Sequence, residues 1–186
     1  MSSWGAALDA VLHQRGGALF AYAFVLTGDP HAAEDLVQEA LVRVFRKGRA
    51  PQSVDAAHAY VKRAIQTSFI DTHRRAQARP RPDDRTAERV APDPTDAADL
   101  HAALMEAVLS LPPRERTCLV MRYFDGLSAV AIAEQLGIAA GSVRRYLHDG
   151  IATLQRTHGD FGLDPSDASE GGGESHVIVS TKGGRR

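Results

Sequence analysis

The stretch LSAVAIAEQLGIAAGSVRRYLHDG, residues 127–150, predicts two short helices joined by a tight turn. Ser128 is suited to cap the first helix, because its hydroxyl can accept a hydrogen bond from a free backbone amide. Gly137 permits the left-handed conformation that ends a helix. A small residue (Ala133), a glycine four positions later and a β-branched residue six positions further (Val143) have the spacing of a helix-turn-helix. The alternative is an ordinary helical hairpin.

The second helix of this segment is the candidate DNA-reading element. In a helix-turn-helix, the exposed early residues of the second helix enter the major groove, and arginine can pair with guanine or hold phosphates. The candidates are Ser142, Arg144, Arg145, Tyr146 and His148. Asp149 would repel phosphate, so we expect the contacting surface to end near His148. The alternative for the arginine pair is an ordinary solvated charge.

Composition and charge narrow the class of protein. The chain has 186 residues, with 44% hydrophobic and 6% aromatic residues, and its alanine-rich apolar runs favour helices over sheets. The net charge of −1 conceals an uneven distribution. Residues 60–82 hold six Lys and Arg side chains against one acid, whereas residues 158–174 hold five acids and no Lys or Arg. A basic segment of this kind can serve a nucleic acid even when the total charge is near zero.

The sequence shows no pattern typical of a catalytic, metal or cofactor site. Cys118 is the only cysteine and lies in an apolar run, so we expect a buried thiol and a reducing compartment. There is no secretory leader pattern and no apolar run long enough for a membrane helix, which predicts a cytoplasmic protein without membrane insertion. We find no metal-spaced Cys/His cluster, no glycine-rich phosphate loop and no catalytic constellation. We therefore expect no enzyme activity, no metal and no cofactor.

The part of the chain before the linker predicts three helices. Residues 4–27 have helical periodicity with a weak point at Gly16-Gly17. Asp29 and Pro30 form a helix start, and residues 30–47 then carry the cleanest apolar face. A third helix is expected from about Asp55 to Arg75. The helix over 30–47 presents acids and glutamine outward, which suits protein docking or plain solvation and is wrong for DNA.

The third helix is basic and carries two aromatic residues. It could grip a nucleic acid backbone, and Tyr60 and Phe69 could stack on exposed bases, the alternative being that either ring packs in the core. RPRPDDRTAERVAPDPTD, residues 79–96, then predicts a flexible linker. After it come an amphipathic helix to Leu111, a further helix to about Phe124, the helix-turn-helix, and a polar tail that we expect to be disordered.

Taken together, these segments resemble a known family. AEDLVQEALVRVFRK precedes AYVKRAIQTSFIDTHRR, and after the linker comes LPPRERTCLVMRYFDGLSAVAIAEQLGIAAGSVRRYLHDGIATLQ. This order closely resembles the extracytoplasmic-function (ECF) sigma factors, small two-domain members of the bacterial sigma-70 family, and looks nearest to the actinobacterial branch. The likeness covers about residues 15–156. It implies an all-α fold of two small helical domains joined by a flexible linker.

The resemblance implies roles for the first domain, which would be sigma region 2. Its acidic helix would bind the clamp helices of the polymerase β′ subunit through Asp35, Leu36, Gln38, Glu39 and Arg43. Its basic helix would recognise the −10 element, and a loop around 48–57 would capture a flipped base. The −10 candidates are Tyr60, Arg63, Thr67, Ser68, Asp71, Arg74 and Arg75. The family usually has asparagine where Thr67 stands, which puts base preference there in question.

The second domain would be sigma region 4. It would read the −35 element through the five residues of the recognition helix given above, with Arg116 on phosphates, and would touch the β flap. The family usually has a serine-like cap where Ala139 stands and often a basic residue where Asp149 stands. The predicted limits are 1–78 for region 2, 79–98 for the linker, 99–157 for region 4 and 158–186 for the tail.

The sequence therefore predicts a sigma factor that binds core RNA polymerase and directs promoter-specific initiation through −10 and −35 recognition. Core RNA polymerase and promoter DNA are the expected partners, and family members are often held by an anti-sigma factor. One alternative is a stand-alone helix-turn-helix regulator, which would need a dimer interface and a palindromic operator. Another is a protein-interaction adaptor that has lost DNA binding, for which Asp149 and Thr67 leave room.

Overall fold

The computed structural model describes residues 3–46, 53–77, 97–159 and 163, and over these residues it is helical with no strand. The first three helices are α1 (Ser3–Thr27), α2 (Pro30–Phe45) and α3 (Val54–Gln77). The others are α4 (Ala97–Ser110), α5 (Pro113–Leu119), α6 (Ala129–Leu136) and α7 (Ala140–His158), with a short π-helical turn, η1 (Val120–Phe124), between α5 and α6. The predicted all-α class is confirmed.

The helices α1, α2 and α3 pack around the first hydrophobic core. Asp29 starts α2 as predicted, since its Oδ1 accepts a hydrogen bond from the Ala32 amide at 2.7 Å and Pro30 is the first helical residue. On α3 one face is buried against this core: Ala57, Val61, Ala64, Ile65 and Ser68. The helix α1 runs unbroken through Gly16-Gly17, so the expected weak point does not divide it.

The helices α4 to α7 surround the second core, and the helix-turn-helix is confirmed. Ser128 caps α6, its hydroxyl accepting a hydrogen bond from the Ala131 amide at 3.2 Å. Gly137 ends α6 in the left-handed conformation, with φ at 67°. Ala133 and Val143 are buried where α6 and α7 meet. The local sequence thus supplies the cap, the turn and the packing that place α7.

Gly150 is a packing residue. Glycine lowers helix propensity, but α7 continues through Gly150 to His158. A Cβ at this position would lie 2.8 Å from Leu119 Cδ1 and 3.4 Å from Glu115 Cβ, both on α5. The absence of a side chain therefore lets α7 approach α5 closely, which offsets the helix propensity that glycine loses.

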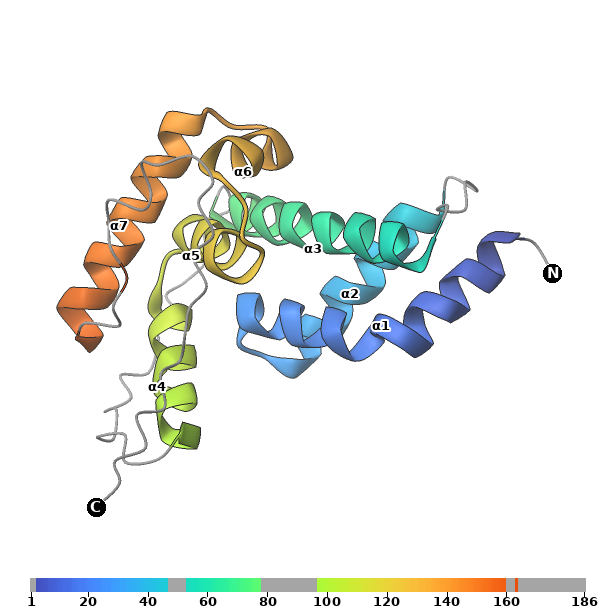
Figure 1. The fold of residues 1–186 in the computed structure, drawn as a ribbon, viewed down its shortest axis with the longest axis horizontal. Helices are drawn as coiled ribbons and strands as arrows, with labels where there is room; N and C mark the ends of the chain where they lie inside the picture. Colours follow the sequence, from blue (N-terminus) through green and yellow to red (C-terminus); the bar gives the residue numbers. More distant parts are fainter. Residues whose placement is uncertain (1–2, 47–52, 78–96, 160–162, 164–186) are drawn as a thin grey trace, which may run out of the picture.

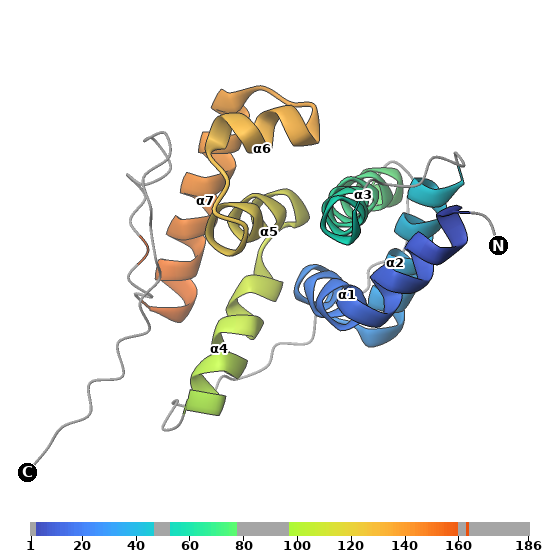
Figure 2. The same ribbon diagram turned by 45° about the vertical axis from the view of Figure 1, so that its right-hand side comes forward.

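The two groups of helices lie against each other (Figure 1). In Figure 2, α3 faces α5, while α1 lies near α4. Val120 of η1 is buried in the first core although it follows α5. The predicted linker over 79–96, the first part of the capture loop predicted around 48–57 and most of the predicted disordered tail lie outside the described residues. Residues 54–57 of that predicted loop are helical, because α3 already begins at Val54. Helix α4 begins at Ala97, inside the limits of 79–98 predicted for the linker, and the domain limits stay predictions.

Candidate nucleic-acid interface

The outer face of α2 carries the predicted docking residues. Asp35, Gln38, Glu39 and Arg43 are exposed, whereas Leu36 is 7% exposed and packs in the first core. Leu36 therefore packs beneath this face and is not exposed to a binding partner. Val42, at the spacing i+7 from Asp35, is 63% exposed and was not among the predicted residues. An exposed valine among polar neighbours is typical of a face that binds another protein. Helical periodicity in the sequence could have located this face but does not identify its partner.

The helix α3 divides its predicted −10 residues between surface and core. Arg63, Arg74 and Arg75 are exposed, and Tyr60 is 56% exposed. Phe69, in contrast, is 3% exposed and packs in the first core, as the core-packing alternative expected for a ring on this helix. The aromatic side chain available for stacking on a base is therefore Tyr60.

Three other members of the −10 set are held by neighbours. Ser68 is 2% exposed, and its hydroxyl lies 3.4 Å from both Arg43 Nη1 and Glu39 Oε1 on α2. Thr67 donates from its hydroxyl to the carbonyls of Arg63 and Ala64 along its own helix, at 3.1 Å each. Asp71 pairs with Arg74 at 3.6 Å. Ser68 thus joins α3 to the docking helix and does not form part of its outer surface.

The start of α7 presents a basic surface. Arg144, Arg145 and His148 are exposed, and Ser142 and Tyr146 are partly exposed. The Arg145 guanidinium lies 5.3 Å from the centre of the Tyr146 ring, and the Tyr146 hydroxyl accepts a hydrogen bond from Arg114 Nη1 at 2.9 Å. These five residues share one end of α7, and α5 adds Arg114, which the sequence did not single out.

Arg116 does not share that surface. Its guanidinium donates to three backbone carbonyls, those of Leu26 at 2.5 Å, Leu109 at 2.5 Å and Leu111 at 3.0 Å. Burial lowers the pKa of Arg116 to about 10. In this arrangement its charge lies between the two domains, and the predicted contact with phosphate has no support from its position.

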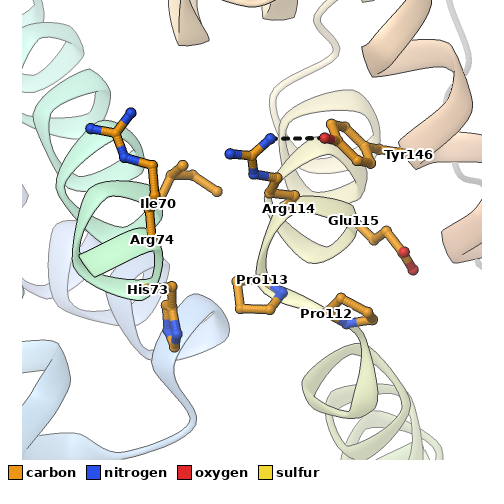
Figure 3. A pocket seen from close by; sticks show the side chains of 8 residues that line it. All are labelled: Ile70, His73, Arg74, Pro112, Pro113, Arg114, Glu115 and Tyr146. Carbon is orange, nitrogen blue, oxygen red and sulfur yellow. Dashed lines mark hydrogen bonds between the residues drawn. The ribbon is translucent and has the colours of Figure 1, made fainter. Parts of the chain in front are cut away.

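A small cavity of about 140 Å³ lies between α3 and α5 (Figure 3). Arg74 from α3 and Arg114 from α5 flank it, with Tyr146 bonded to Arg114. The other lining residues are Ile70, His73, Pro112, Pro113 and Glu115. The cavity therefore brings one exposed cation from each domain, Arg74 and Arg114, to the same place on the surface.

Other kinds of site find little support in the described part of the chain. It holds no group of three or more His, Cys, Asp or Glu side chains arranged for a metal ion. None of its helices is long and apolar enough to cross a membrane. Cys118 is buried, and burial raises the pKa of its thiol to about 12, which suits a packing residue and not a nucleophile.

Comparison with protein families identifies both halves of the chain. The family described as Sigma-70 region 2 matches residues 12–79, and the family described as Sigma-70, region 4 matches residues 101–154. The two matches include the α2 and α3 surfaces in the first case and the helix-turn-helix in the second. Their order along the chain is the one that the sequence motifs predicted.

Individual relatives agree. The ECF RNA polymerase sigma factor SigL of Mycobacterium tuberculosis is 30% identical over 163 residues, covering 85% of this chain and 92% of that protein. RNA polymerase sigma-E factor of Streptomyces coelicolor is 30% identical over 147 residues, covering 79% and 83%. Among solved structures, the sigma factor RpoE of Bartonella quintana, crystallised with the anti-sigma factor NepR, has a TM-score of 0.56 at 23% identity. This structural match covers 84% of this chain and 96% of the RpoE chain, and it shows that the two share a fold.

Two helical domains carry the two sigma-70 family matches, and the helix-turn-helix has the geometry that its sequence predicts. The relatives match over most of their own length. The chain therefore belongs to the ECF sigma factors, and it is an RNA polymerase sigma factor that acts in transcription initiation.

Proposed function

We propose that this sigma factor divides its work among three surfaces. The exposed face of α2, with Asp35, Gln38 and Glu39, binds the clamp helices of the polymerase β′ subunit. The basic face of α3 reads the −10 element, with Tyr60 stacking on an unpaired base and the arginines on the backbone. The start of α7, with Arg144 and Arg145, enters the major groove of the −35 element.

The single observation that carries this proposal is the contrast between α2 and α7. Both helices are exposed on one side. On α2 that side presents three carboxylates (Glu34, Asp35 and Glu39) and one guanidinium group (Arg43), whereas the first turns of α7 present two guanidinium groups (Arg144 and Arg145) and one carboxylate (Asp149). Carboxylates are repelled by a phosphate backbone and attract a basic protein surface, and guanidinium groups do the reverse. The exposed charges thus favour protein for α2 and DNA for α7.

The proposal extends to catalysis, cellular location and regulation. The protein has no catalytic activity of its own and lends specificity to the polymerase, which does the chemistry. It works in the cytoplasm, where the chromosome and the polymerase are. An anti-sigma factor holds it in reserve, as RpoE of Bartonella quintana was crystallised with one. A stand-alone regulator is disfavoured because both sigma-70 regions match in one chain.

Site-specific photocrosslinking tests the assignment of surfaces. A photoreactive phenylalanine is placed at Gln38, at Tyr60 or at His148, each of which is exposed, and each variant is assembled with core polymerase and promoter DNA. The proposal expects crosslinks from position 38 to β′, from position 60 to the −10 segment and from position 148 to the −35 segment. Crosslinks from position 38 to DNA, or from position 148 to protein alone, would overturn the assignment.

A further inference from the structure

An acidic side chain lies in line with the basic residues of α7. The inner side of this helix is made by its buried residues, which are Val143, Leu147, Gly150, Ile151 and Leu154. On the opposite side Gly141, Arg145 and Asp149 follow one another at four-residue spacing, and all three are exposed. Residues four apart lie one above the other on a helix, so these three form a row. Asp149 therefore faces the same way as Arg145, which the proposed function places in the major groove.

The glycine at the start of this row is not explained by packing within the described part of the chain. A Cβ on Gly141 would meet nothing within 4 Å, whereas a Cβ on Gly150 would lie 2.8 Å from Leu119 Cδ1. Glycine has a lower helix propensity than alanine, but it lets another molecule approach the backbone closely. The bare backbone at Gly141 therefore suits contact with a molecule outside the chain, which on this surface is DNA.

The protein itself does little to stabilise the charge of Asp149. Its Oδ1 lies 3.3 Å from His148 Nδ1, and the His148 and Asp149 side chains are 65% and 49% exposed, so this pair contributes little to stability. Burial first, and the charge of Asp149 second, raise the pKa of the Glu115 carboxyl on α5, so the two acids repel each other. Arg145, one turn away, lies 5.3 Å from the centre of the Tyr146 ring. Asp149 Oδ2 can therefore accept a hydrogen bond from another molecule.

The chemistry of the major groove limits what a carboxylate in this row can contact. A carboxylate only accepts hydrogen bonds, and the phosphates repel it. In the major groove guanine and thymine offer acceptors, adenine offers a donor beside an acceptor, and cytosine offers a donor, its N4 amino group. Cytosine is therefore the base whose edge matches a carboxylate without an adjacent acceptor. The guanidinium of Arg145 has the opposite preference, for O6 and N7 of guanine.

The spacing along α7 suits the reading of two nearby base pairs. Arg145 and Asp149 are four residues apart, which is about 6 Å along the helix at ~1.5 Å per residue. Successive base pairs of B-form DNA are roughly 3.4 Å apart, so the two side chains can reach base pairs about two steps apart. The positive charge of Arg145 also offsets the repulsion between Asp149 and the phosphates on either side.

We propose that Asp149 is a specificity-determining residue of this sigma factor, whose carboxylate accepts a hydrogen bond from N4 of a cytosine in the −35 element. This cytosine lies about two base pairs from a guanine that Arg145 reads. The DNA-reading surface of α7 thus extends through Asp149 and does not end at His148. The inference rests on the proposed function, because it takes α7 as the helix that enters the major groove.

Selection of DNA by the holoenzyme tests this assignment. Core polymerase is assembled with the wild type, Asp149→Asn, Asp149→Ala or Glu134→Gln, each holoenzyme binds a pool of duplex DNA of random sequence, and the bound fraction is sequenced. Asparagine pairs with N6 and N7 of adenine, so Asp149→Asn should change the preference at one −35 position from cytosine to adenine by about tenfold or more. Asp149→Ala should lose the preference at that position. Glu134→Gln is the matched control, because it removes the same charge from an exposed position of α6, and it should keep every wild-type preference.

Duplexes that differ at this position alone then connect the base to the side chain. Changing the cytosine to thymine replaces the N4 donor with the O4 acceptor, and this should weaken binding by the wild-type holoenzyme about tenfold and binding by Asp149→Ala about twofold or less. Unchanged base preferences in both Asp149 variants would overturn the inference. Tighter binding of both variants to every sequence alike would also overturn it, because Asp149 would then act on phosphates and not on a base.

The failures of this inference and of the proposed function can be told apart. Asp149 is exposed, so its variants should fold, and circular dichroism checks their helix content; should one of them lose it, the other still tests the preference. If the wild-type holoenzyme selects a −35 element that neither variant alters, the inference alone fails. If the wild type selects no −35 element, or position 148 crosslinks to protein alone, the proposed function fails and the inference falls with it.

Discussion

Arg116 on α5 donates a hydrogen bond from Nη1 to the backbone carbonyl of Leu26 on α1, at 2.5 Å and across 90 residues of chain. The same guanidinium donates from Nη2 to the carbonyls of Leu109 and Leu111, where α4 gives way to α5. One side chain therefore joins the end of α1 to the α4–α5 junction. A residue that the family resemblance assigns to phosphate serves here as a tie between domains.

Arg116→Ala should lower the free energy of unfolding by about 2–3 kcal/mol, because charged hydrogen bonds are lost and buried carbonyls are left without a donor. Thermal or urea unfolding followed by circular dichroism measures the loss. Arg114→Ala is the comparison variant: Arg114 is exposed two residues earlier on the same helix and donates one hydrogen bond, to the Tyr146 hydroxyl, so its loss of stability should be smaller. Equal stability of Arg116→Ala and wild type, together with weaker DNA binding, would instead favour the phosphate contact.

His73 should make the fold sensitive to mild acid. Burial first, and the positive charge of Arg116 second, lower the pKa of His73 below its usual 6.5. Between that folded pKa and 6.5 the unfolded chain binds more protons than the folded one, so the free energy of unfolding falls as the pH drops through this window. His73→Gln should reduce this fall, as seen in unfolding curves from pH 7.5 to 5. A His31→Gln control, altering an exposed histidine, should keep the wild-type pH dependence.

Asp35→Ala should weaken binding to core polymerase about tenfold or more, on the scale of a charge-assisted hydrogen bond lost at an interface. Glu34→Ala removes the same charge from the neighbouring exposed position and should leave the affinity close to wild type. Competition with a labelled wild-type protein for sigma-free core enzyme measures both. Equal affinities for Asp35→Ala and wild type would remove the α2 docking claim.

Arg144→Ala should reduce transcription from a promoter with a matched −35 element by about ten- to a hundredfold, in line with ~1–3 kcal/mol for a bidentate base contact. Arg156→Ala changes an exposed arginine near the end of the same helix and should have little effect. The loss should disappear when the −35 element is scrambled. A loss of the same size on both promoters would mean that Arg144 does not read sequence.

Local sequence predicted the helices well. Ser128, Gly137 and Val143 lie within fifteen residues of one another, so their spacing determines the cap, the turn and the packing of the helix-turn-helix. Asp29 likewise caps α2 through a contact three residues away. Such features depend on a few neighbouring residues and need no knowledge of the other domain.

The domain contact could not be predicted in the same way. Gln66 lies on α3 and is fully buried, and its partners are 44, 59 and 69 residues away. The burial of Asp125 and of Arg116 likewise depends on helices distant in the chain, and the resemblance therefore assigned Arg116 to phosphates. The signal available in the sequence was a polar residue, Gln66, beside the apolar face of its helix. Such a residue does not indicate which distant side chains it will contact.

The central claim is that this chain directs polymerase to promoters with separate −35 and −10 elements. The most direct measurement is transcription of genomic fragments by sigma-free core RNA polymerase with and without the purified protein, followed by sequencing of the transcript 5′ ends. The account predicts new start sites that share two upstream elements, and loss of those starts with Arg144→Ala. Tight binding to core polymerase with no new start sites would contradict it.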